Sequence, residues 1–270
     1  MKLLLLLSLL TSTAQAFTLN NNFGASFKDS KVNVYVDVQT TCSNAGVTIY
    51  ELEDLVKEAT ASYWNTVATS SLRLKPAGFS SATSNISTGR LCSATDDACI
   101  AAAQGAGNLI PPVNDIVIAC NDLDANFGGA GVLAVTIPNK FSGKKIAGAV
   151  ILLNNDSSPP TNFANLSRSD KIAVLAHELG HAIGLGHAKG SEALMYYKTV
   201  KLRRNLSQDD IDGVSFLYPV TLDACGLFAT VEQPRGGGPP FLQMALTLGL
   251  FVLLIELRRL LNRAKARTPA

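Results

Sequence analysis

The chain has 270 residues, 47% of them hydrophobic, and a formal net charge of +2. Its central part, residues 17–240, carries 17 Lys and Arg against 20 Asp and Glu, a net charge of −3. This mildly acidic part has no basic patch of the kind that binds nucleic acid, so a nucleic-acid partner is not expected. Its length of about 200 residues is enough for one domain with a proper core.

The first residues predict export. Lys2 gives a positive start, Leu3–Leu10 form an apolar run, and Ala14–Ala16 provide a small-residue cleavage pattern. This order is typical of a secretory signal peptide. We therefore expect residues 1–16 to be removed and the mature chain to begin at Phe17. An uncleaved anchor is the alternative, but the apolar run is too short to span a membrane.

The central part predicts a mixture of strands and helices. Alternating β-branched residues indicate a strand at 31–38, and further strands are expected near residues 71, 115 and 148. Apolar residues at helical spacing predict helices at 50–68 and 166–184, the second with Ser169 as a candidate N-cap. A last helix at 207–219 is expected to begin at a capping Ser207 and to stop before Pro219. The predicted fold class is α+β.

The cysteines indicate disulfides without fixing their pairing. All five lie in the exported part, at Cys42, Cys92, Cys99, Cys120 and Cys225. An exported chain favours disulfides, and an odd number leaves at least one thiol free or paired elsewhere. Cys92 and Cys99 are close enough in sequence to close a loop, but the connectivity stays open.

The other end predicts attachment to a membrane. Residues 231–240 form a linker rich in Pro and Gly, and residues 241–257 contain fifteen uncharged positions in a row. Residues 258–270 then form a basic tail, which indicates a span with this tail in the cytoplasm. The run is short for a span, and a core or amphipathic helix is the alternative. The arrangement also resembles sorting signals of bacterial surface proteins, in which the tail is cut off.

Three histidines carry the chemistry. They are the only histidines of the chain, and all of them fall within HELGHAIGLGH, residues 177–187. On a helix His177 and His181 lie about 40° apart, so both imidazoles can reach one zinc ion. Gly184 can end the helix in a backbone conformation that other residues resist, which allows His187 to return to the same ion. Three protein ligands leave the fourth position of a zinc ion open for water.

Glu178 predicts the reaction. It follows the first histidine and is turned about 100° away from it on the helix, too far to be a further ligand. It can instead hold the water at the metal and act as its general base. A purely structural histidine cluster is the alternative. So many residues of a zinc-site pattern within one short stretch would rarely occur together by chance, which argues against this alternative.

The stretch HELGHAIGLGH resembles the metzincin pattern HExxHxxGxxH, and the chain looks most like the matrixins. The resemblance covers roughly residues 30–219 and implies a zincin-like catalytic domain at 17–230. That fold would be a twisted mixed sheet with an active-site helix and a C-terminal helix. Met195, in ALMYY, would form the Met-turn beneath the zinc. GVLAVTIP would be the rim strand, where Leu133 and Ala134 bind an extended substrate.

Two departures from the family bear on the metals. Matrixins usually hold a structural zinc with histidines in these strands, whereas this chain has Val135 and Ile151 where two of them would be placed. We therefore expect one zinc ion, the catalytic one. Asn154, Asn155 and Asp156 could hold calcium, although paired carboxylates are missing.

Two further departures concern regulation and catalysis. No PRCG-type motif precedes the first strand, and Cys42 lies in a different context, so a cysteine switch is not expected. Tyr197 stands two residues after Met195, where astacin-like and serralysin-like metzincins place a tyrosine that can reach the metal. Tyr197 is therefore a candidate stabiliser of the transition state. The alternative is a wall residue of the substrate pocket.

These features together predict a zinc metalloendopeptidase that hydrolyses peptide bonds of extracytoplasmic proteins. Its partners would be a protein or peptide substrate and, through the C-terminal helix, a membrane. A zinc-binding surface protein or adhesin without turnover is the first alternative. A zinc hydrolase acting on a small amide or sugar is the second, and the Met-turn and the last helix favour a peptidase over it.

Overall fold

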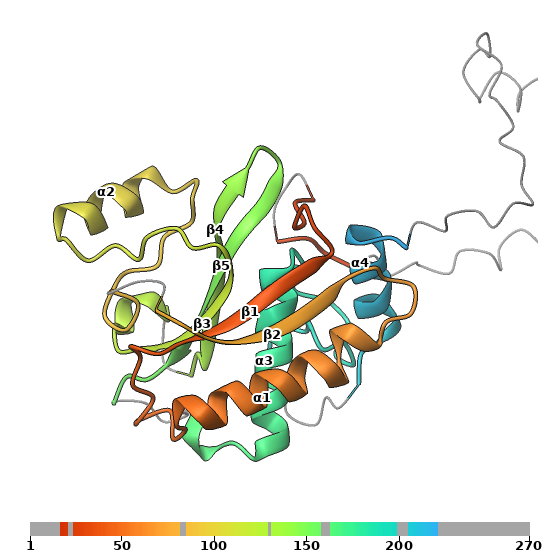
Figure 1. Cartoon of the computed structure of the whole chain (residues 1–270), viewed down its shortest axis with the longest axis horizontal. Helices are drawn as coiled ribbons and strands as arrows, with labels where there is room; N and C mark the ends of the chain where they lie inside the picture. The colour runs from red at the N-terminus through yellow and green to blue at the C-terminus, as the bar shows by residue number, and fades with distance from the viewer. Residues whose placement is uncertain are drawn as a thin grey trace, which may run out of the picture. The chain divides into compact units, whose positions relative to one another are not determined.

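One mixed sheet lies at the centre of the described residues, which are 17–20, 24–81, 85–128, 131–157, 163–198 and 205–220 of the computed structural model (Figure 1). Its strands are β1 (Lys31–Asp37), β2 (Arg73–Ser80), β3 (Asp115–Asn121), β4 (Ala134–Ser142) and β5 (Lys145–Asn154). Their order is β2-β1-β3-β5-β4, with parallel pairs up to β5 and an antiparallel β4. The predicted mixed sheet is confirmed, and β4 forms one of its edges.

The sheet separates two apolar layers. Two helices, α1 (Ile49–Ser62) and α3 (Arg168–Ala182), lie side by side across one face, where Ile116 and Ile151 pack against them. Val117 and Val150 face the other way, toward a layer formed by side chains of the segment that connects β2 to β3. Strand β3 is buried along almost its whole length because both of its faces are covered.

Helix α1 begins where a capping box can form and ends earlier than predicted. The Thr48 hydroxyl accepts the Glu51 N–H while the Glu51 carboxylate accepts the Thr48 N–H. The expected helix at 50–68 stops at Ser62 and continues as a short 3-10 turn, Trp64–Thr66. Trp64 is fully buried there, and its indole N–H donates to the Ala176 carbonyl at 2.7 Å. This bond ties the turn to the middle of α3.

Helices α3 and α4 (Gln208–Leu217) carry or support the site. The N-cap of α3 is Ser167 rather than the predicted Ser169, because the Ser167 hydroxyl accepts the Asp170 N–H. The predicted N-cap of α4 is correct: Ser207 forms a capping box with Asp210. Both helices therefore begin at serines that satisfy backbone donors of the first turn.

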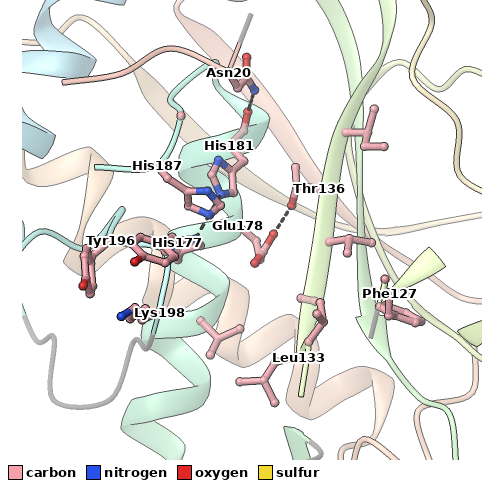
Figure 2. A pocket seen from close by; sticks show the side chains of 18 of the residues that line it. Asn20, Phe127, Leu133, Thr136, His177, Glu178, His181, His187, Tyr196 and Lys198 are labelled. Atoms are coloured by element: carbon pink, nitrogen blue, oxygen red, sulfur yellow. Dashed lines mark hydrogen bonds between the residues drawn. The ribbon is translucent and has the colours of Figure 1, made fainter. Parts of the chain in front are cut away.

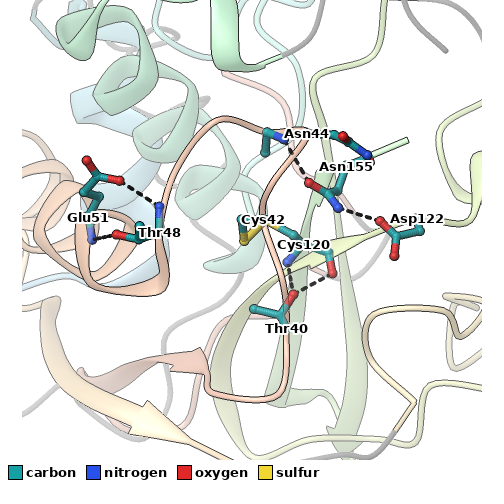
Figure 3. Close-up of a disulfide and its surroundings, with 9 residues drawn as sticks. Thr40, Cys42, Asn44, Thr48, Glu51, Cys120, Asp122 and Asn155 are labelled. Carbon is teal, nitrogen blue, oxygen red and sulfur yellow. Dashed lines mark hydrogen bonds between the residues drawn. A yellow bond between two sulfur atoms is a disulfide. The ribbon is translucent and has the colours of Figure 1, made fainter. Parts of the chain in front are cut away.

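Two disulfides connect described residues, and one helix was not predicted. Cys42 is bonded to Cys120 on β3 (Figure 3), and Cys92 is bonded to Cys99. The second bond confirms that the short Cys92–Cys99 loop is closed. The helix that was not predicted is α2 (Asp97–Gly105), which contains Cys99. It is short, rich in alanine and capped by Asp96. Cys225 lies outside the described residues.

The two ends of the chain contribute no described element. The predicted signal peptide 1–16, linker 231–240, helix 241–257 and tail 258–270 all lie outside the described residues. Within the part that is described, no helix has the length and apolar character needed to cross a membrane. The domain boundaries therefore stay predictions.

Candidate functional site: a three-histidine metal centre in a cleft

A cleft of about 1300 Å³ runs between α3 and the edge strand β4 (Figure 2). The three histidines and Glu178 line it on the α3 side, and Leu133 to Ile137 line it on the β4 side. All predicted metal-ligand candidates, the predicted base and the predicted substrate rim thus meet in one cavity.

The three imidazoles converge on one point. His181 Nε2 lies 3.1 Å from His177 Nε2 and 3.2 Å from His187 Nε2. Four ligands around a zinc ion at about 2.0–2.1 Å are about 3.3 Å from one another, so these spacings suit tetrahedral ligation. Among the described residues this is the one group of three potential ligands close enough to share an ion.

Backbone carbonyls fix which ring nitrogens face inward. His177 Nδ1 lies 2.7 Å from the Leu194 carbonyl, and His181 Nδ1 lies 2.8 Å from the Leu185 carbonyl. A carbonyl only accepts hydrogen bonds, so each Nδ1 carries the proton and each neutral ring presents an unprotonated Nε2. Two such lone pairs at 3.1 Å repel each other unless a cation lies between them. The residues present therefore fit a zinc ion.

Burial favours the neutral form of two of the imidazoles. Desolvation, aided by the neighbouring His177, lowers the pKa of His181 to about 4. Burial also lowers the pKa of His187. Neutral imidazole is the form that binds a metal, so these ligands are ready to bind at ordinary pH.

The turn after α3 returns the third histidine, as the sequence predicted. Gly184 has φ +114°, a backbone conformation that favours glycine, and a Cβ there would lie 2.4 Å from the Ala25 carbonyl oxygen. Residues near the N-terminus brace this turn: Gly186 N–H donates to the Thr18 carbonyl, and the Asn20 amide donates to the His181 carbonyl. The sequence pattern contained no signal for this bracing.

Met195 lies in a turn that packs against α3. Met195 is buried, and a Cβ on Gly180 of α3 would stand 2.3 Å from its sulfur, so glycine there allows the close approach. Asp210 of α4 holds the turn, because its carboxylate accepts the N–H groups of Leu194 at 2.8 Å and Met195 at 3.1 Å. The role of Met195 beneath a zinc ion stays a prediction. Asp210 was not predicted as a site residue, although its spacing from Ser207 in the sequence is that of a capping box.

Glu178 lies in the cleft beside the histidines but does not join them (Figure 2). It is 7% exposed, and its Oε2 accepts a hydrogen bond from the Thr136 hydroxyl at 2.6 Å. Burial raises the pKa of Glu178, while His181 and the Thr136 bond act in the opposite direction. A buried carboxylate with a raised pKa is suited to accept and return a proton.

The rim residues lie where the edge strand begins, with Ala134 as the first residue of β4 and Leu133 directly before it. The Leu133 carbonyl accepts the Asn154 N–H of β5 at 2.9 Å, so it points into the sheet. Backbone groups alternate sides along a strand, and those of Ala134 and Thr136 therefore face the cleft. An extended peptide could pair with this edge as an additional strand.

Tyr197 also lines the cleft, near the third histidine. Its ring centroid is 6.4 Å from that of His187, its side chain is 58% exposed, and Lys198 Nζ stands 5.5 Å above its ring. This position suits both the transition-state role and the pocket-wall role. Its function stays a prediction.

The neighbouring strands contain apolar packing where relatives place further metal ligands. Val135 packs with the layer away from α3, whereas Ile151 belongs to the layer that includes α3. The two side chains therefore point to opposite faces of the sheet. Histidines at these two positions could not bind one zinc ion together, so the expectation that Val135 and Ile151 both replace ligands of one structural zinc is wrong. Val117, Val150 and Leu152 are among the apolar side chains of the layer in which Val135 packs.

The expected calcium ligands bind protein atoms. Asn154 Oδ1 accepts the Asp156 N–H, and Asn155 Oδ1 accepts the Ala45 N–H. Asn155 also donates to Asp122 (Figure 3). Both amide oxygens therefore already have a donor, and calcium binding stays a prediction.

A mixed sheet, a histidine pair on a helix, a third histidine after a glycine turn and a buried methionine after it fit the metzincin pattern. Residues 119–219 match the sequence model of the family described as Matrixin. Over these residues the chain is similar to the matrixins (peptidase M10).

Similar proteins occur in animals and plants. The chain is 57% identical to stromelysin-1 of Rattus norvegicus over 58 residues, 20% of this chain and 12% of that protein. It is 44% identical to matrix metalloproteinase-27 of Tupaia belangeri over 66 residues, 23% of this chain and 12% of that protein. Metalloendoproteinase 1 of Glycine max is 45% identical over 56 residues, 20% of this chain and 18% of that protein. These matches span less than a fifth of each relative.

Proposed function

We propose that this protein is a zinc-dependent endopeptidase that hydrolyses peptide bonds of extracytoplasmic proteins. One observation carries the proposal. Three Nε2 atoms meet at 3.1 and 3.2 Å beside a buried carboxylate, in a cleft bounded by an edge strand. A metal site with a neighbouring base serves hydrolysis, and an edge strand beside it suits an extended peptide.

His177, His181 and His187 would hold the zinc. When bound, zinc supplies a Lewis acid that polarises the scissile carbonyl and makes water more acidic. The chain itself supplies the alignment: the free-edge amides of Ala134 and Thr136 bind the substrate backbone and bring its carbonyl to the histidines. Enclosure between α3 and β4 excludes bulk water and strengthens electrostatic interactions there.

Glu178 is the general acid–base in this proposal. Its carboxylate takes the proton of the attacking water and then gives it to the departing amine nitrogen. Tyr197 would donate its hydroxyl to the negative charge that develops on the carbonyl oxygen. The pocket-wall role remains the competing assignment for Tyr197.

The domain would act outside the cytoplasm. Two disulfides among the described residues suit an oxidising compartment. We place the catalytic domain on the outer side of a membrane, attached through residues 241–257 or released after processing there. Residues 1–16 would direct export and be removed.

The test compares the purified zinc-loaded protein with its Glu178→Ala variant on a complex protein mixture, mapping new termini by mass spectrometry. Glu192→Ala is the matched control, because Glu192 is exposed and does not line the cleft. We expect Glu178→Ala to lose about 10²–10⁴-fold in activity while keeping its zinc. Activity within tenfold of wild type would remove Glu178 from the mechanism. A zinc-loaded wild type that cleaves nothing would favour the binding protein without turnover.

A further inference from the structure

Strand β4 presents one hydroxyl to the helix that carries the base. Its residues Ala134 and Thr136 pair with Leu153 and Ile151 of β5, which pack in the layer that includes α3. Side chains alternate along a strand, so Ala134, Thr136 and Pro138 share the face toward α3. Thr136 is the one of these three whose side chain can donate a hydrogen bond.

That hydroxyl meets the base directly. Thr136 Oγ1 donates to Glu178 Oε2 at 2.6 Å, within the range of a hydrogen bond to an ionised carboxylate. In Figure 2 Thr136 reaches Glu178 from the β4 side, across from the histidines. Threonine branches at Cβ and has few favoured χ1 angles, so the strand sets the direction of the hydroxyl.

We propose that Thr136 is the positioning residue for Glu178. The inference rests on the proposed peptidase function and deepens it. A glutamate has three rotatable side-chain bonds, and packing alone leaves its carboxylate free to turn about the last of them. The Thr136 bond holds Oε2 against β4. The proton of the attacking water then passes to Oε1, and from Oε1 to the leaving amine.

This arrangement also couples the base to the substrate. The backbone groups of Thr136 face the cleft, where the peptide pairs with β4, while its side chain holds the base on α3. One residue thus contacts the substrate backbone and the proton acceptor at once. A shift of β4 would therefore move the scissile bond and Glu178 together.

The test uses the full zinc-loaded protein and a peptide that the wild type cleaves. Thr136→Val removes the hydroxyl at constant shape, and Thr136→Ser keeps it. Thr69→Val is the matched control, because the Thr69 hydroxyl pairs with Ser215 at 2.6 Å away from the cleft. We expect kcat of Thr136→Val to fall about tenfold with KM and zinc content unchanged, the loss of one hydrogen bond to a charged group. Thr136→Ser should recover kcat to within about threefold of wild type, and Thr69→Val should match wild type.

Other outcomes overturn the inference. A raised KM with unchanged kcat would make Thr136 a wall of the cleft, and a Ser variant as slow as the Val variant would assign the effect to the lost methyl group. If Thr136→Val does not fold, Thr136→Ala against Thr136→Ser repeats the comparison with the hydroxyl as the sole difference.

A crystallographic arm separates this inference from the proposed function. Wild type and Thr136→Val are crystallised, and the position of the Glu178 carboxylate is compared. A turned or doubled carboxylate in the variant supports positioning, and an unchanged one refutes it. The crystal structures test the positioning role of Thr136 even if the wild type cleaves no peptide. A wild type that cleaves no peptide would refute the proposed peptidase function but not this positioning role.

Discussion

Asp210 connects the last helix to the metal centre, so its removal should disturb both stability and zinc binding. The side chain is 2% exposed, and its Oδ2 accepts the N–H groups of Leu194 and Ser207, while Oδ1 accepts the Met195 N–H. The Leu194 carbonyl in turn accepts from His177 Nδ1. We therefore predict the effects of Asp210→Asn, which keeps the shape of the side chain and replaces one acceptor by an amide.

The expected loss of stability follows from these hydrogen bonds. If the Asn carbonyl takes the place of Oδ2, its NH₂ group faces the Met195 N–H, and that bond becomes a clash of two donors. Losing a buried hydrogen bond to a charged group and leaving a donor unsatisfied costs about 3 kcal/mol. For a domain of this size 1 kcal/mol corresponds to about 2–4 °C, so the Tm should fall by about 6–12 °C. Loosening the partner of His177 should weaken zinc binding about tenfold.

Calorimetry of the metal-free and zinc-loaded proteins measures the first effect, and competition with a chelator measures the second. Asp212→Asn is the control, because Asp212 lies two residues away on the exposed side of α4 and bonds only within the helix to Gln208. It should change the Tm by less than about 2 °C. An Asp210→Asn protein that is as stable as this control and binds zinc normally would refute the chain of contacts from α4 to His177.

Three further outcomes are expected. Tyr197→Phe should lower kcat with little change in KM if Tyr197 stabilises the oxyanion, and an unchanged kcat would return it to the pocket wall. Dialysed protein should contain one zinc per chain by elemental analysis, since all three histidines belong to the site described. Two zinc ions per chain would contradict the expectation that the strands near Val135 hold no structural zinc. Full-length protein should fractionate with membranes and a chain ending near residue 231 should be soluble, and a soluble full-length protein with its tail intact would exclude the anchor.

Local pattern was enough to predict most elements and the metal centre. The histidines could be assigned because helical periodicity and one glycine fix their spatial relation over only eleven residues. Strands β1, β3 and β5 were readable from β-branched runs, and the N-cap at Ser207 from its capping pattern. These features depend on neighbours in sequence, so no tertiary information was needed.

Contacts between distant segments could not be read in this way. The Cys42–Cys120 bond joins residues 78 positions apart, and no spacing rule selects it. The bond from Thr136 to Glu178 depends on the packing of β4 against α3, and the hold of Asp210 on the Met-turn depends on where α4 docks. The N-cap of α3 was misplaced by two residues because Ser167 and Ser169 are equal by type and differ only in geometry.

One of the two carbonyls that orient the histidines also sets an order of assembly. His177 lies on α3, but the Leu194 carbonyl beside its ring belongs to a turn whose N–H groups donate to Asp210, 33 positions after His177 in the chain. His181 finds its partner, the Leu185 carbonyl, within four residues, whereas the ring of His177 depends on this more distant turn. The zinc site becomes complete only when α4 has docked, so tight metal capture belongs to the last stage of folding.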